Sequence, residues 1–226
     1  MRVLGIDTAT WRASVGLCES GQVVTEQSQL TTGNHAASLL PLIDTTLRSV
    51  GWSLASLDAV AVSGGPGSFT GLRVGLSVAK GLARAARLQL VAVPTLEALA
   101  RTVADRHGVI CALLDARKGE LYAAVFESAR SDWRCLQADS LLTLDALVER
   151  LPTPCTIVGD AIVRYGPSLH DCFGAAVTLL PFETYGPHGG VVAALGHARL
   201  AALGPAEIAT LEPFYVRPSA ATAKAA

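Results

Sequence analysis

The hydrophobic pattern of the first hundred residues alternates short apolar runs with longer amphipathic stretches. Short runs bounded by turn residues are typical of buried strands, whereas Leu39, Ile43 and Leu47 recur at helical spacing. The pattern predicts the order βββαβαβα. The predicted elements are strands Arg2–Asp7, Ala13–Glu19 and Gln22–Ser28, helix 36–50, strand Asp58–Ser63, helix Leu72–Arg87, strand Leu88–Val93 and helix Thr95–Arg106.

The same order recurs in the second half, where Asp115 ends a strand 108 residues after Asp7. This repetition predicts an α/β fold of two similar lobes, each a mixed five-stranded sheet with helices on its faces. We expect the lobes at 1–107 and 108–226, with a disordered tail at 220–226. The second set is strands Val109–Asp115, Glu120–Glu127 and Arg134–Ala138, helix Leu144–Leu151, strand Cys155–Val158, helix Ala161–Leu169, strand Ala176–Leu180 and helix Gly190–Leu203.

Asp7 and Asp115 are the first candidates for chemistry, because each ends a strand just before a tight hairpin. Two duplicated lobes normally face one another across a cleft, into which these carboxylates would point. The alternative is that each aspartate caps its own hairpin turn. The sequence leaves both interpretations open.

The glycine-rich segment 63–75 follows a buried strand and opens a helix, a position that favours an anion. It has no Lys for a Walker A loop, and Gly65, Gly67 and Gly71 do not match the dinucleotide fingerprint. In the helix that follows, small residues recur every four positions. This stripe predicts close approach of another backbone, either the chain's own sheet or a second chain; its members are Gly71, Gly75, Ala79 and Ala83.

Composition and charge narrow the functional classes. The chain has 226 residues, a formal charge of −1, a pI near 6.5 and a mean hydropathy of +0.40, with no apolar stretch long enough for a membrane span. We therefore expect a cytoplasmic protein, and any nucleic acid held mostly by another chain. The short clusters Arg84/Arg87 and Arg117/Lys118 are typical of solvated surface. The five histidines include no H-x-x-x-H pair that could hold a metal on a helix.

Several motifs together resemble the bacterial TsaB (YeaZ) family. The resemblance is strong to about residue 125 and loose afterwards. The motifs are Gly5–Thr10 (GIDTAT), Asn34-His35 ahead of Leu39–Pro41, Gly64–Arg73 (GGPGSFTGLR), Asp115–Tyr122 (DARKGELY) and, loosely, Pro213–Arg217.

The resemblance implies a fold of the actin, Hsp70 and sugar-kinase superfamily and a role in threonylcarbamoyladenosine formation in tRNA. Family members are non-catalytic paralogues of TsaD and pair with TsaD and TsaE, or form a homodimer when TsaD is absent. ATP or ADP with Mg²⁺ is then expected only in that complex, and tRNA contact is indirect. The residues implied for partner docking are His35, Leu39, Leu40, Ile43, Leu47, Gly71, Gly75, Ala79 and Ala83. Those of a vestigial nucleotide site are Asp7, Thr8, Thr10, Gly65, Gly67 and Asp115.

Two rival interpretations remain at this stage. The chain could be a small-molecule kinase or ATPase of the same fold, using Asp7, Asp115 and Mg²⁺. It could also be a peptidase acting on its partner, although no Ser/His/Asp constellation has recognisable spacing. Asp160, in the segment where the superfamily has an adenosine-contacting glycine pair, counts against nucleotide binding by the chain alone.

Overall fold

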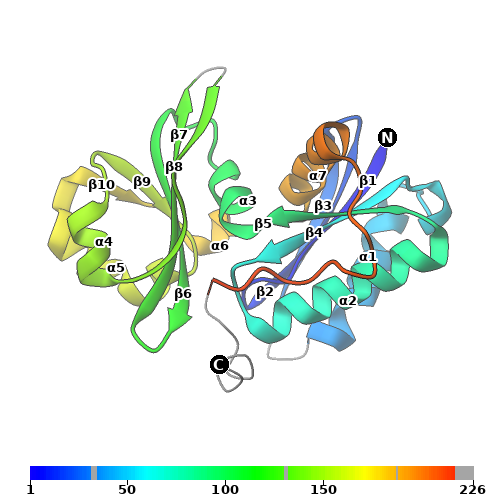
Figure 1. The fold of residues 1–226 in the computed structure, drawn as a ribbon, viewed down its shortest axis with the longest axis horizontal. Helices are drawn as coiled ribbons and strands as arrows, with labels where there is room; N and C mark the ends of the chain where they lie inside the picture. The colour runs from blue at the N-terminus through cyan, green and yellow to red at the C-terminus, as the bar shows by residue number, and fades with distance from the viewer. Residues whose placement is uncertain (32–34, 130–131, 187, 217–226) are drawn as a thin grey trace. The chain divides into compact units, whose positions relative to one another are not determined.

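The computed structural model describes residues 1–31, 35–129, 132–186 and 188–216, with the backbone alone at 35 and 36. The chain forms two compact units, Met1–Ala98 with Pro187–Pro213, and Leu99–Gly186 with Phe214–Ala226. Each contains one mixed five-stranded sheet (Figure 1), which confirms the predicted α/β fold of two similar halves. Within the described residues, no helix is long and apolar enough to cross a bilayer.

The first sheet has the strand order β3-β2-β1-β4-β5. Strand β1 is antiparallel to β2, with Asp7 opposite Ser14, and parallel to β4, which is in turn parallel to β5. The carboxyl ends of β1 and β4 therefore lie at the same edge. The elements of this half are β1 (Arg2–Asp7), β2 (Arg12–Glu19), β3 (Gln22–Leu30), α1 (His35–Ser49), β4 (Ala59–Gly65), α2 (Phe69–Ala86), β5 (Gln89–Pro94) and α3 (Thr95–Arg101), with a 3₁₀ turn at Leu54–Ser56.

The second sheet repeats the first strand for strand, in the order β8-β7-β6-β9-β10. Its central strand β6 is antiparallel to β7 and parallel to β9, as β1 is to β2 and β4. The duplicated sequence pattern is therefore a duplicated topology. The elements of this half are β6 (Gly108–Arg117), β7 (Glu120–Ala129), β8 (Asp132–Thr143), α4 (Leu144–Arg150), β9 (Cys155–Val158), α5 (Ala161–Phe173), β10 (Val177–Leu179) and α6 (Phe182–Tyr185), with a 3₁₀ turn at Gly174–Ala176. Helix α7 (Gly189–Leu203) follows them in the chain and packs on the first sheet.

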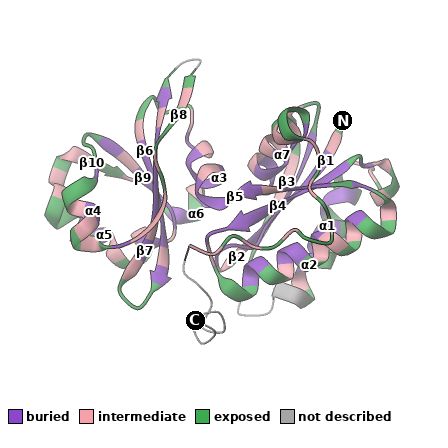
Figure 2. Cartoon of the chain, viewed as in Figure 1, coloured by how far each residue is buried: buried purple, intermediate pink, exposed green. Residues whose placement is uncertain are grey.

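Helices cover both faces of the first sheet (Figures 1 and 2). On one face α1 and α2 bury Leu39, Ile43 and Ala79 against the apolar side chains of β1, β2 and β4. On the other face α7 buries Val192 and Ala193. Burial on both faces explains why the central strands are almost continuously apolar.

Helix α7 contacts the first sheet backbone against backbone. A β-carbon at Gly5 would overlap the backbone of Gly189 and Ala193, and one at Gly16 would overlap Gly190. Since α7 comes from the end of the chain, the predicted lobe boundary at 107/108 is wrong for this helix, which belongs to the first unit. Sequence order suggested the opposite, because the helix closes the second βββαβαβα repeat.

Two local differences from the predicted elements have clear causes. Helix α2 begins at Phe69 and not at Leu72, because the Ser68 hydroxyl accepts a hydrogen bond from Gly71 N (3.2 Å) and caps the first turn. Helix α6 was not predicted, since its four residues are too short to show a period.

Glycine substitutions test how closely α7 packs on the first sheet. We expect Gly5→Ala to lower the free energy of unfolding by about 3 kcal/mol, because its β-carbon meets backbone that cannot move independently. Gly81→Ala is the matched control: Gly81 lies in α2 with open space around it, and alanine there should stabilise by about 0.5–1 kcal/mol. Urea unfolding followed by circular dichroism measures both. Equal stability of the two variants would contradict the close packing of α7.

Candidate functional site

Asp7 lies buried at the carboxyl end of β1, with 2% of its surface exposed. One carboxylate oxygen accepts a hydrogen bond from Ala9 N (2.9 Å), and the other accepts one from the Ser63 hydroxyl. Burial raises the pKa of the Asp7 carboxyl, and the hydrogen bonds from Ser63 and Ala9 oppose that rise. Both oxygens are thus engaged within the first unit, as the turn-capping interpretation predicts.

The glycine-rich segment packs on the β1–β2 loop. Thr8 donates a hydrogen bond to the Gly71 carbonyl (2.8 Å), and a β-carbon at Gly71 or Gly75 would overlap Thr8. A β-carbon at Gly67 would meet Ala9 in the same way. The glycines are therefore needed for close contact between this loop and α2.

The remaining polar residues of the predicted nucleotide site also have internal partners. The buried Thr10 hydroxyl accepts a hydrogen bond from Arg12 N (3.2 Å), and Gly65 N donates one to the Thr95 hydroxyl (3.1 Å). The structure brings Asp7, Thr8, Thr10, Gly65 and Gly67 together at one edge of the first sheet. Their partners give them a structural role there, and nucleotide binding by them stays a prediction.

Asp115 occupies the corresponding place in the second unit. Its carboxylate accepts a hydrogen bond from Arg117 N (2.8 Å), the same two-residue turn that Asp7 makes with Ala9. Its other oxygen lies 3.5 Å from Arg117 and 3.6 Å from Arg164. Asp160 lies beside it and accepts a hydrogen bond from Asp115 N (2.9 Å). Burial raises the pKa of Asp160 to about 6.

Seven of the nine predicted docking residues are buried inside the first unit, and docking by them stays a prediction. Four form the inner stripe of α2: Gly71 and Gly75 face Thr8, and Ala79 and Ala83 are fully buried. Leu39, Ile43 and Leu47 belong to the same core. The side chain of His35 lies outside the described residues.

Leu40 is the predicted docking residue that faces solvent, with 52% of its surface exposed. Phe69, at the start of α2, is 47% exposed, and the Arg73 guanidinium lies 3.8 Å from the centre of its ring. Since α1 and α2 bury their inner sides on the sheet, these side chains belong to the outer surface of the α1–α2 layer. Leu40 and Phe69 thus offer apolar surface on two neighbouring helices of the first unit.

A polar cluster at the start of α7 was not predicted from the sequence. Glu26 of β3 pairs with His188 (2.5 Å) and accepts a hydrogen bond from Gly190 N (2.8 Å), while Ser14 of β2 accepts one from Gly189 N (2.9 Å). These contacts satisfy the first amides of the helix. The bonded residues lie 162 to 175 positions apart in the sequence, so no local pattern predicts these contacts. Over the described ranges, no three His, Cys, Asp or Glu side chains gather as a metal site would need.

Comparison with known proteins agrees with this geometry. A family model described as "TsaD: tRNA N6-adenosine threonylcarbamoyltransferase" matches residues 21–173. The tRNA threonylcarbamoyladenosine biosynthesis protein TsaB of Escherichia coli is 36% identical over 67% of this chain, and the match spans 66% of that relative, just under two thirds of its length. The protein of the same name from Bacillus subtilis is 26% identical over 99% of this chain and 97% of its own length.

Solved structures extend the likeness to the whole fold. YeaZ from Pseudomonas aeruginosa matches 95% of this chain and 99% of its own, with a TM-score of 0.77 at 26% identity. Component A of (R)-2-hydroxyglutaryl-CoA dehydratase from Acidaminococcus fermentans matches 89% of this chain and 99% of its own, with a TM-score of 0.53 at 9% identity. This second match shows the fold alone, and it agrees with the two-lobed fold that the family resemblance implies.

The buried Asp160 gives a test by pH. An acid whose pKa is raised on folding stabilises the protein fully below its unfolded pKa near 4, and loses that contribution as pH rises through about 6. We expect Asp160→Asn to become more stable relative to wild type between pH 4 and 7, by up to about 3 kcal/mol. Urea unfolding at a series of pH values measures the difference. The exposed control Asp44→Asn should show no such change, and a flat profile for Asp160→Asn would contradict the burial.

Proposed function

The chain belongs to the TsaB (YeaZ) family, and we propose on that basis that it is a non-catalytic subunit required to form threonylcarbamoyladenosine in tRNA. It acts by binding a TsaD-type transferase, which carries out the transfer to the adenosine next to the anticodon. The matched TsaD family model supports this proposal, because it relates residues 21–173 of the chain to the transferase that the chain would bind.

The observation that carries the proposal is the outer surface of the α1–α2 layer. Leu40 and Phe69 are about half exposed there, while Val74 and Val78 are partly buried beside the core. An apolar surface of this kind gains free energy when a partner covers it. We therefore propose that TsaD docks on the outer surface of α1 and α2, and not on the buried stripe of small residues in α2.

The aspartates support a non-catalytic role. A kinase of this fold needs carboxylates that are available to a metal-bound nucleotide. Here Asp7 is held by Ala9 and Ser63, and Asp115 by Arg117 and Arg164. We accordingly propose that ATP or ADP with Mg²⁺ takes part only in the complex with TsaD and TsaE, and that the chain works in the cytoplasm. When TsaD is absent, the same face serves a homodimer.

Substitutions on the outer surface test the docking face. We expect Leu40→Asp and Phe69→Asp to weaken the complex with the TsaD of the same organism at least about tenfold, because each places a charge in an apolar contact. Val163→Asp is the matched control, since Val163 is 61% exposed on α5 of the second unit. Size-exclusion chromatography with light scattering measures the complex.

The buried stripe gives the complementary result. Ala79→Leu should lower the free energy of unfolding by about 1–3 kcal/mol, because Ala79 is fully buried in the core under α2. Binding measured on the remaining folded protein should match wild type. If Leu40→Asp and Phe69→Asp bind TsaD as well as Val163→Asp does, the outer surface is not the docking face.

A further inference from the structure

The C-terminal part of α2 carries three cations in a row. Lys80, Arg84 and the C-cap residue Arg87 are four and three positions apart, so Lys80 and Arg84 share one side of the helix and Arg87 continues the row beyond its end. No acidic residue occurs anywhere in the α2 sequence, Phe69–Ala86. The row is therefore a local positive stripe on a chain whose formal charge is −1.

The stripe is not neutralised by its surroundings. Arg84 and Arg87 are exposed, and within the part of the chain that the structure describes neither has an ion pair. Lys80 donates to the carbonyl of Ala209 (3.4 Å) and has no carboxylate partner among those residues. The positive charge is accordingly available to an anionic ligand.

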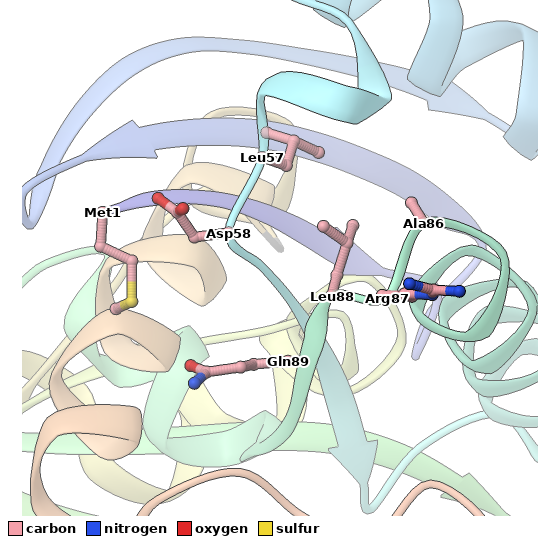
Figure 3. Close-up of a pocket in the computed structure, with 7 residues that line it drawn as sticks. All are labelled: Met1, Leu57, Asp58, Ala86, Arg87, Leu88 and Gln89. Atoms are coloured by element: carbon pink, nitrogen blue, oxygen red, sulfur yellow. The ribbon is translucent and has the colours of Figure 1, made fainter.

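The stripe ends at a pocket of about 620 Å³ at the amino ends of β4 and β5 (Figure 3). The pocket is an open surface depression with a mostly polar lining: Asp58, Gln89 and Arg87 are exposed, and Leu57 and Leu88 lie largely covered beside them. A pocket of this volume has room for a nucleoside. Arg87 belongs both to the stripe and to the pocket, so one ligand could contact both.

The polar groups of the pocket suit a nucleobase. One oxygen of Asp58 accepts a hydrogen bond from Arg2 N (2.7 Å), and its second oxygen and the Gln89 amide have no partner among the described residues. Amide and carboxylate side chains are the groups that read the donors and acceptors of base edges. A base with an exocyclic amino group would donate a hydrogen bond to Asp58, which the side-chain carboxylates of an acidic peptide cannot do.

We propose that the stripe and the pocket form a binding site for single-stranded RNA, with an unstacked base in the pocket and its flanking phosphates on Arg87, Arg84 and Lys80. The inference rests on the proposed function, which brings tRNA to the complex, and adds a direct contact from this chain. Proteins bind unpaired nucleotides by placing cations along the phosphates and hydrogen-bonding groups at the base edges.

The first experiment measures binding of a fluorescein-labelled tRNA transcript to the full chain by fluorescence anisotropy at several salt concentrations. The charge-reversed double variant Arg84→Glu/Arg87→Glu should bind at least about tenfold more weakly, and its salt dependence should fall by about one unit of slope for each lost phosphate contact. Lys118→Glu/Arg150→Glu is the control, because it makes the same charge change at exposed sites of the second unit.

The second experiment separates the pocket from the stripe. Gln89→Ala should weaken RNA binding several-fold and leave the salt slope unchanged, because it removes a base contact and no phosphate contact. Poly-glutamate and AMP at the same concentrations should displace the RNA poorly, since neither fills the pocket and the stripe together.

The proposal is overturned if the chain binds no tRNA at concentrations up to about 100 μM, the weak end of non-specific binding, if the two double variants bind alike, or if poly-glutamate or AMP competes as well as unlabelled RNA. These outcomes leave the proposed function intact, because docking to TsaD is read out separately on Leu40 and Phe69. If the chain does not dock to TsaD but still binds RNA, the proposed function is overturned and the RNA-binding site stands.

Discussion

The close backbone contact of α7 with β1 and β2 is the constraint on which the first unit depends. Gly5 and Gly16 leave no side chain between the strands and the helix, and Gly189 and Gly190 do the same from the helix side. Ser14 and Glu26 then bind the first amides of α7. Without this helix one face of the first sheet would expose Val3, Ala61 and Val91, which are now buried, so residues 1–98 need the end of the chain to complete their core.

The opposite face of the sheet explains why α2 has two different sides. The inner side of α2 carries only small residues because the β1–β2 loop and the sheet approach the helix backbone closely. These residues are Gly71, Gly75, Ala79 and Ala83. Interior glycines weaken a helix, and here the contact with Thr8 offsets that loss. The outer side is free of this restriction and carries the phenyl ring and the cations. The division leaves the outer side of α2 available for partners.

The sequence predicted the duplicated fold well, because the 108-residue repetition and the short apolar runs report local periodicity. It also predicted correctly that small residues in α2 mean close backbone contact, but it could not choose between an internal and an external contact. That choice depends on Thr8, which lies 63 residues from Gly71. For the same reason the sequence did not predict where α7 packs or that Glu26 contacts His188. Contacts between residues far apart in the chain leave no periodic pattern in the sequence. Leu40 entered the candidate docking residues through the family resemblance, and the structure places it on the exposed side of α1.

Reconstitution of the modification reaction tests the central claim most directly. Purified TsaD and TsaE of the same organism, supplied with threonylcarbamoyl adenylate, ATP and unmodified tRNA, would be assayed for threonylcarbamoyladenosine by mass spectrometry with and without this chain. The account predicts that product forms only when the chain is present, and that Asp7→Asn, if folded, supports the reaction as wild type does. Equal product without the chain, or ATP turnover by the chain alone that Asp7→Asn abolishes, would contradict it.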